Sequence, residues 1–294
     1  MNASPDLRRI GVVGAGQMGA GIAEVCARAG LDVVVREVTD EAAAAGRRRI
    51  TGSLDRALRK GKLTELERDT ALAGLQVTTD LDALADRDLV VEAIAEDEGL
   101  KTEVFAALDK TVQREDAILA SNTSSIPIMK LGMATGRARQ VIGIHFFNPV
   151  PVLDLVEIVP SLLTSKQTTE RARNFVQATL EKRCVLAQDR AGFVVNALLI
   201  PYLLSAVRMA EAGTATAEDI DSGMVHGCAH PMGPLQLADL IGLDTVAAIA
   251  ASMYEEHKEP LYAAPPLLLR MVEAGLLGRK SGHGFYPYEP GGGQ

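Results

Sequence analysis

Residues 9–19 read RIGVVGAGQMG, an apolar strand that runs into a glycine-rich turn and the start of a helix. The glycines have the spacing GxGxxG in the strand–turn–helix context that a dinucleotide site requires. Gly14 permits the tight turn, Gly16 lets a pyrophosphate approach the backbone, and Gly19 allows the helix to pack closely. The N-terminus of the helix also favours an anion. We therefore predict that this dinucleotide loop contacts the cofactor through Gly14, Ala15, Gly16, Gln17, Met18 and Gly19.

A second apolar strand, residues 32–35, leads to an acidic residue at the position that usually binds the adenosine ribose. Glu37 lies 23 residues after Gly14. An acid at about that distance accepts hydrogen bonds from the ribose hydroxyls of NAD. Arg36 precedes Glu37, and an arginine there can instead bind the 2′-phosphate of NADP. The spacing favours NAD as the cofactor, with NADP open as the alternative at this point.

Strand and helix patterns alternate up to residue 187. Further strands are expected at 76–79, 89–94, 117–120 and 183–187, and helices at 99–112 and 165–180. This alternation predicts an α/β unit with a Rossmann-type doubly wound, mostly parallel sheet. A helical hairpin insertion is expected near residues 40–74, because 40–60 has helical periodicity and Thr64 begins a capping box. From residue 189 the pattern is entirely helical, so we predict two domains, 1–188 and an all-helical domain over 189–294.

Residues 141–159, VIGIHFFNPVPVLDLVEIV, place a histidine and a carboxylate on neighbouring apolar runs. His145 ends the first run and Glu157 lies in the second. Imidazole has an ordinary pKa of about 6.5, so it can take and return a proton near neutrality. A carboxylate on one ring nitrogen fixes the tautomer and stabilises the imidazolium. We predict that His145 is a general acid and base assisted by Glu157; the alternative is a strand-end histidine and a glutamate paired with an arginine.

Two polar stretches follow predicted strands, residues 92–96 and 121–125. Ligands of doubly wound sheets bind beyond the carboxyl ends of the strands, where these stretches are expected to lie. The hydroxyl of Ser124 is therefore a candidate contact for a substrate oxygen. The same Ser/Asn/Thr cluster, placed before Ile126 and Pro127, would also serve as a plain helix cap.

Composition and charge indicate which kinds of binding partner the sequence argues against. The 294-residue chain is 47% hydrophobic with a net charge of −8, which argues against a nucleic-acid surface. No apolar signal segment starts the chain and no run is long enough for a bilayer span, so neither secretion nor a membrane partner is expected. Three scattered cysteines predict no metal site and a reduced cytoplasm. Residues 41–62 carry seven basic against two acidic residues, either a solvated helix face or a surface that attracts a polyanionic substrate.

Several motifs in one order resemble the 3-hydroxyacyl-CoA dehydrogenase family, most of all its short stand-alone bacterial 3-hydroxybutyryl-CoA dehydrogenases. The resemblance covers nearly the whole chain. The motifs are GAGQMG, VVEAIAED, ASNTSSIPI, GIHFFNPVPVLDLVEIV, GFVVNALLIPYLLSA, HPMGPLQLADLIGLD and GRKSGHGFYPY.

The resemblance implies reversible, NAD-dependent oxidation of a 3-hydroxyacyl-CoA to the 3-ketoacyl-CoA. It implies a catalytic His145 paired with Glu157, with Ser124 and Asn196 holding the oxygenated end of the substrate. It also implies a homodimer formed by the helical domain, and a place in fatty-acid β-oxidation or butanoate metabolism. The positions that match the family's cofactor contacts beyond the dinucleotide loop are Glu37, Glu96, Lys101, Ser124, Asn148 and Lys280, and those that match its CoA contacts are Ser53 and Lys60.

Two departures and two rival functions accompany the resemblance. Ala197 stands where the family often has arginine, and Arg36–Glu37 stands where it often has an apolar residue and aspartate. One rival is a dehydrogenase of small free 3-hydroxy acids, but those enzymes typically use a lysine at the start of the second domain, and residues 194–205 contain none. The other is an NAD-binding protein without turnover, which the intact catalytic set disfavours.

Overall fold

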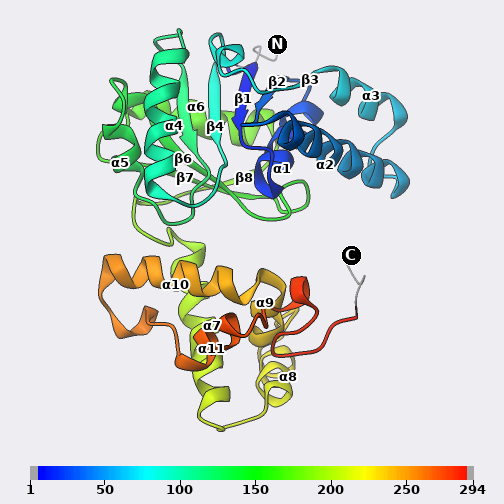
Figure 1. Cartoon of the computed structure of the whole chain (residues 1–294), viewed down its shortest axis with the longest axis vertical. Helices are drawn as coiled ribbons and strands as arrows, with labels where there is room; N and C mark the ends of the chain where they lie inside the picture. The colour runs from blue at the N-terminus through cyan, green and yellow to red at the C-terminus, as the bar shows by residue number, and fades with distance from the viewer. Residues whose placement is uncertain (1–5, 290–294) are drawn as a thin grey trace. The chain divides into compact units, whose positions relative to one another are not determined.

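The computed structural model describes residues 6–289 and divides the chain into two compact units (Figure 1). The amino-terminal unit is Met1–Asp189 and the carboxy-terminal unit is Arg190–Gln294. Each unit has its own apolar core.

The amino-terminal unit is built on one eight-stranded sheet with the order β3-β2-β1-β4-β5-β6-β7-β8. All neighbouring strands are parallel except β6 and β7, which pair antiparallel. The order reverses at β1, the topological switch point where doubly wound sheets bind their ligands. The expected fold class is confirmed. The strands are β1 Arg9–Val13, β2 Asp32–Arg36, β3 Leu75–Thr78, β4 Leu89–Glu92, β5 Ile118–Ser121, β6 Val141–Phe146, β7 Leu155–Pro160 and β8 Arg183–Leu186.

Helices connect these strands, and their apolar faces form the core with the sheet. The predicted single helix at 165–180 is instead α6 followed by one π-helical segment, Phe175–Thr179. Phe175 and Val176 are buried there, so the wider turn keeps both side chains in the core. The helices of this unit are α1 Gln17–Arg28, α2 Asp40–Arg59, α3 Glu65–Ala73, α4 Glu98–Thr111, α5 Ile128–Met133 and α6 Lys166–Asn174, with short 3-10 turns at Asp82–Leu84 and Ala138–Gln140.

Helices α2 and α3 form the helical hairpin, which lies at one side of the amino-terminal unit (Figure 1). Ile50 and Leu54 are buried on α2, as their spacing predicts. A Cβ added at Gly46 would lie 2.3 Å from the Cβ of Ala15, so α2 packs directly against the dinucleotide loop. Thr64 caps α3 in a complete capping box with Glu67.

Over residues 190–289, the secondary structure of the carboxy-terminal unit is helical apart from isolated bridges near the end of that range. Asp221 and Asp239, both buried, tie its parts together. Asp221 accepts hydrogen bonds from the first backbone amides of α9 and from the Tyr286 hydroxyl. Asp239 accepts from the amides of Phe285 and Tyr286 and from the Tyr288 hydroxyl. The helices are α7 Val195–Glu211, α8 Ala217–Cys228, α9 Pro234–Ile241, α10 Leu243–His257 and α11 Pro266–Glu273, with 3-10 turns at Pro260–Tyr262 and Arg279–Ser281.

Within residues 6–289, no single helix has the length and apolar composition needed to cross a membrane. One helix pair, Pro234–Ile241 with Leu243–His257, passes that test by length and composition only, and it is bent by 94°.

Candidate active site

The dinucleotide loop leaves β1 and enters α1 through three glycines that differ in what surrounds them. Gly14 has φ +94°, and a Cβ there would lie 2.7 Å from the carbonyl oxygen of Ala93. A Cβ at Gly19 would lie 1.9 Å from the carbonyl oxygen of Gly14. Protein packing therefore requires both of these glycines. A Cβ at Gly16 would meet nothing within 4 Å, so the space over the Gly16 backbone is open, as the close approach of a pyrophosphate would require.

The start of α1 and the Ala15 peptide complete the loop. Gly16 is the N-cap of α1, and as a glycine it has no side chain to cap the amides of the first turn. Such a helix start suits a pyrophosphate. Glu37 Oε1 accepts the Ala15 amide at 2.5 Å, and Arg49 Nη1 donates to the Ala15 carbonyl at 2.5 Å. The loop conformation is thus fixed from both sides, and its residues fit a dinucleotide.

Arg36 lies beside Glu37 but lines a different space. Its side chain borders a cavity of about 170 Å³ whose other lining residues include Val13, Leu81 and Glu103. The Nε atom of Arg36 is buried without a hydrogen-bond partner in the described part of the chain. The carboxylate of Glu37, not the guanidinium of Arg36, therefore contacts the dinucleotide loop.

His145 and Glu157 face each other across β6 and β7. The antiparallel register pairs the two residues directly, and His145 Nδ1 lies 2.7 Å from Glu157 Oε2. Both side chains are buried, with exposed fractions of 6% and 0%. The ring of Phe147 packs edge-on against the imidazole at 4.6 Å between centroids. Because β7 reverses direction, Glu157 lies at the same sheet edge as the carboxyl end of β6, which brings a base and its orienting acid together.

The polar stretch after β4 reaches the one after β5. Glu96 Oε1 accepts hydrogen bonds from the Thr123 hydroxyl and the Ser124 amide, and the Ser124 hydroxyl lies 3.4 Å away. Burial raises the pKa of Glu96, but the charge of Lys101 and these hydrogen bonds lower it by a larger amount, so the net shift is downward. The carboxylate thus holds the backbone that carries Ser124.

Lys101 is buried under this stretch. Its Nζ lies 2.6 Å from Glu92 Oε1 and 3.3 Å from Glu96 Oε2. Glu92, which is fully buried, also accepts from the Ser121 hydroxyl and from the Ile94 amide. Lys101 therefore pairs with two carboxylates of its own unit.

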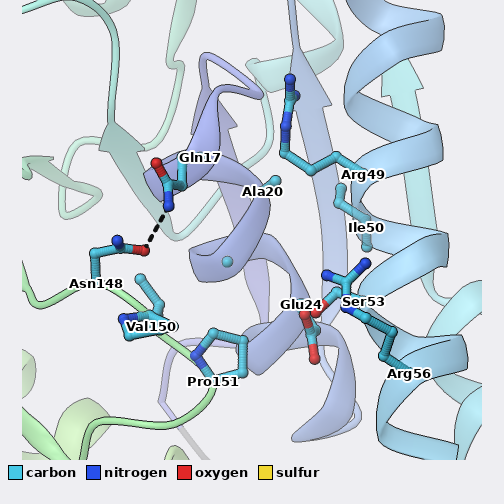
Figure 2. Close-up of a pocket in the computed structure, with 12 residues that line it drawn as sticks. Gln17, Ala20, Glu24, Arg49, Ile50, Ser53, Arg56, Asn148, Val150 and Pro151 are labelled. Atoms are coloured by element: carbon cyan, nitrogen blue, oxygen red, sulfur yellow. Dashed lines mark hydrogen bonds between the residues drawn. The ribbon is translucent and has the colours of Figure 1, made fainter. Parts of the chain in front are cut away.

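The segment after β6 brings Asn148 to the dinucleotide loop. Asn148 Oδ1 accepts from Gln17 Nε2 at 3.0 Å (Figure 2). Both residues line a groove of about 140 Å³ between α1, α2 and this segment, and Ser53 lines the same groove. Lys60 is the exposed C-cap residue of α2. Two predicted cofactor positions and one predicted CoA position are therefore close together.

Asn196 and Lys280 lie in the carboxy-terminal unit. Asn196 is buried in the first turn of α7. Lys280, in a 3-10 turn, donates to Asp244 Oδ2 at 2.7 Å. Among residues 6–289, no group of three or more His, Cys, Asp or Glu side chains is arranged to hold a metal ion.

Three residues that matter to this geometry were not singled out from the sequence. Arg49 holds the Ala15 carbonyl, Glu92 neutralises Lys101, and Glu24 is a buried carboxylate in the groove. Glu92 had a signal, since it begins the polar stretch 92–96 noted in the sequence, but no role was predicted for it. Glu24 had a weaker one, since it lies in an apolar helix. Arg49 had none, because neighbouring arginines share its pattern.

A dinucleotide loop at the switch point and a buried His–Glu pair at the same sheet edge define a nicotinamide-dependent dehydrogenase. The family model of the 3-hydroxyacyl-CoA dehydrogenase NAD-binding domain matches residues 9–190, and that of the 3-hydroxyacyl-CoA dehydrogenase C-terminal domain matches residues 192–288. The chain belongs to the 3-hydroxyacyl-CoA dehydrogenase family. The first match also confirms NAD as the cofactor.

Full-length relatives agree with this membership. A 3-hydroxybutyryl-CoA dehydrogenase of Mycobacterium tuberculosis strain H37Rv is 60% identical over 285 residues, covering 97% of this chain and all of that protein. A probable 3-hydroxybutyryl-CoA dehydrogenase of Bacillus subtilis is 43% identical, covering 97% and 98%. The crystal structure of (S)-3-hydroxybutyryl-CoA dehydrogenase from Ralstonia eutropha matches with a TM-score of 0.92 at 44% identity, covering 97% and 100%.

Proposed function

We propose that this chain is an NAD-dependent 3-hydroxybutyryl-CoA dehydrogenase that interconverts 3-hydroxybutyryl-CoA and acetoacetyl-CoA. The observation that carries the proposal is the buried His145–Glu157 pair at the sheet edge that also bears the dinucleotide loop. The full-length relatives named for this reaction support the choice of substrate.

His145 is the proposed general acid and base. Bound NAD would supply the hydride acceptor for C3 in the oxidation, and bound NADH the hydride donor in the reduction. In the oxidation, the imidazole takes the hydroxyl proton of the substrate. In the reduction, the imidazolium returns the proton to the oxygen of the 3-keto group. Glu157, 2.7 Å from Nδ1, fixes the tautomer and stabilises the imidazolium, so Nε2 is the atom we assign to the substrate proton.

Other residues are proposed to bind and orient. Residues 14–19 and Glu37 hold the cofactor, together with Glu96, Lys101, Asn148 and Lys280, as the family pattern implies. Ser124 and Asn196 orient the oxygenated end of the substrate. Ser53 and Lys60 contact the CoA portion. The positive charge of α2 supports this assignment, because it would attract the phosphate groups of CoA.

The test is the loss of NADH absorbance when acetoacetyl-CoA is added to the protein, with NADPH and with free acetoacetate run alongside. We expect rapid loss with NADH and the CoA thioester only. Equal rates with free acetoacetate would favour a dehydrogenase of small hydroxy acids. NADH binding without turnover of either substrate would favour a non-catalytic protein.

We further propose a homodimer formed through the carboxy-terminal unit. Leu198, Leu240, Leu261 and Leu269 of this unit are large apolar side chains that are exposed in the single chain. Light scattering should give twice the chain mass. A monomer at micromolar concentration would exclude the proposal.

A cytoplasmic enzyme of fatty-acid or butanoate metabolism is the setting we propose. Cys26, Cys184 and Cys228 are all unbridged thiols, which suits a reduced compartment. Cell fractionation tests the compartment.

A further inference from the structure

The loop between β5 and α5 carries Ser124 and is held at its start. Glu96 Oε1 accepts hydrogen bonds from the side chains or amides of residues 123–125. After these residues the chain passes through Ile126 and Pro127 into α5, which begins at Ile128. The orientation of Ser124 therefore depends on what fixes the start of α5 as well as on Glu96.

Helix α5 cannot hold its own start. It has six residues, and the side chain of its N-cap residue, Pro127, makes no cap hydrogen bond. The first amides of a helix have no partner within the helix. A helix this short is also not stable in water without contacts from the rest of the fold. An acceptor from another part of the chain is needed to fix these amides.

Asp189 supplies this acceptor. Its Oδ1 accepts the amide of Ile128 at 2.7 Å, and its Oδ2 accepts the amide of Met129 at 2.8 Å. Asp189 follows β8 and is the last residue of the amino-terminal unit. A carboxylate at this place satisfies two helix-start amides and interacts favourably with the positive end of the helix dipole. The start of α5 is therefore fixed by a residue about 60 positions away in the sequence.

The polar cluster that contains Ser124 does not cap α5. Thr123 Oγ1 accepts the amide of Ile126, within the loop itself, at 2.9 Å. The hydroxyl of Ser124 lies 3.4 Å from Glu96 Oε1. The alternative role that the sequence left open for this cluster, a plain helix cap, is filled by Asp189 instead. The Ser124 hydroxyl is thus not needed to cap the helix and can serve a substrate oxygen.

We propose that Asp189 is a positioning residue for the reaction, which fixes the start of α5 and so holds the Ser124 hydroxyl toward the substrate oxygen. This inference rests on the proposed function. Ile126 is buried, and proline fixes the φ angle at Pro127. A shift of α5 would therefore be transmitted to Ser124 and not absorbed by the loop. Small misplacements of an orienting group cost large factors in rate.

Asp189→Asn tests the proposal in the NADH-dependent reduction of acetoacetyl-CoA. The asparagine keeps the shape of the side chain but loses its charge and turns an NH₂ group toward one of the two amides. We expect kcat to fall roughly 10-fold. KM should stay within about threefold, because the CoA portion is proposed to bind elsewhere, at Ser53 and Lys60. Asp189→Glu keeps the carboxylate and should recover part of the loss.

Asp109→Asn is the matched control, because Asp109 holds the chain beyond the other end of the same helix. Its Oδ2 accepts the amide of Gly136 at 2.8 Å, and its Oδ1 lies 2.8 Å from Arg137 Nε. The control removes the same charge and a similar amide contact from the segment after α5. We expect urea unfolding to shift in both variants, but kcat of Asp109→Asn to stay within about twofold. Equal losses of kcat in the two variants would overturn the positioning role.

A double-mutant cycle with Ser124→Ala shows whether Asp189 acts through Ser124. Ser124→Ala alone should lower kcat, since it removes the hydroxyl that orients the substrate. In that background Asp189→Asn should change kcat by no more than about twofold, because the group it positions is absent. Losses that multiply in the double variant would mean that Asp189 acts elsewhere, and the inference would be wrong. If Asp189→Asn does not fold, Asp189→Glu takes its place in the cycle.

The wild type and the Ser124→Ala variant separate this inference from the proposed function. A wild-type protein that does not turn over acetoacetyl-CoA would contradict the proposed function itself. A Ser124→Ala variant with wild-type kcat would contradict the role of Ser124 and overturn this inference with it. Turnover by the wild type, a loss in Ser124→Ala and multiplied losses in the double variant would overturn the role of Asp189 alone.

Discussion

The amino-terminal unit contains two buried charged clusters that are built in different ways. His145 and Glu157 are register partners on adjacent strands, joined by one direct contact at the sheet edge. Lys101 on α4 is instead held between Glu92, which ends β4, and Glu96 in the loop that follows. In the first cluster rigid strands position the ionisable groups, whereas in the second the ionisable groups position a loop. We therefore expect loss of the first cluster to affect mainly turnover, and loss of the second to lower stability in addition to weakening the cofactor contacts proposed for Glu96 and Lys101.

The largest expected effect is on turnover. His145→Ala should lower kcat by roughly 10²- to 10⁴-fold, the usual contribution of a placed acid–base group. Stopped-flow or steady-state loss of NADH absorbance measures it. NADH affinity and the thermal midpoint should change little, since the strands that carry His145 do not depend on it. Turnover close to that of the wild type would remove His145 from the mechanism.

The second expected effect is on folding. Lys101→Met should lower the free energy of unfolding by about 3–5 kcal/mol, because it leaves the fully buried carboxylate of Glu92 without its cation. Urea titration followed by circular dichroism measures this loss. The double variant Lys101→Met with Glu92→Gln should regain much of the stability, since it removes the unpaired charge. A loss below about 1 kcal/mol, the size expected for an exposed pair, would mean that Glu92 is not sealed from water.

The third expected effect, a smaller one on kcat, tests whether Glu157 is a catalytic partner of His145 or a structural acid like Glu92. The glutamine keeps the shape and one acceptor for His145 Nδ1 but cannot stabilise the imidazolium by charge. A hydrogen bond to a charged group is worth about 1–1.5 kcal/mol more than a neutral one, so kcat should fall about tenfold with folding intact. The variant is assayed for kcat and for urea unfolding in parallel. Unfolding of the variant would place Glu157 with Glu92 as a structural acid.

The features that the sequence predicts are those that depend on local sequence patterns. The fold class, the dinucleotide loop and the α2–α3 hairpin depend on local periodicity, glycine spacing and a capping box, and all are present in the structure. The contact between His145 and Glu157 follows from two strand patterns joined by a short loop. Strand boundaries moved by a residue or two, as at β4, which ends at Glu92 where the sequence suggested residue 94.

What the sequence did not predict depends on side chains from separate elements. The pairing of Lys101 with Glu92 joins a strand end to a helix. Sequence periodicity does not predict which lysine side chain is buried. Arg49 and Arg56 lie on one helix with equal charge, and only the packing of α2 against Ala15 and Glu24 distinguishes them. The π-helical segment after α6 depends on how Phe175 and Val176 fit the core.

The smallest expected effect is on the pH dependence of the free energy of unfolding, and it involves Glu96 of the second cluster. The pKa of Glu96 lies below its ordinary value of 4.5, since Lys101 and the hydrogen bonds from residues 123–125 outweigh burial. A folded-state pKa that is depressed stabilises the protein above the unfolded-state pKa, and this stabilisation is lost as the pH falls through the folded-state value. The difference in unfolding free energy between the wild type and Glu96→Gln should therefore be constant near neutrality and shrink below about pH 4.5. Urea titrations from neutral pH to about pH 3 measure it, with Glu115→Gln as a control that removes the same charge from an exposed position. A difference that persists unchanged into acid would mean that the Glu96 carboxylate contributes nothing to the loop beyond what the amide of glutamine supplies.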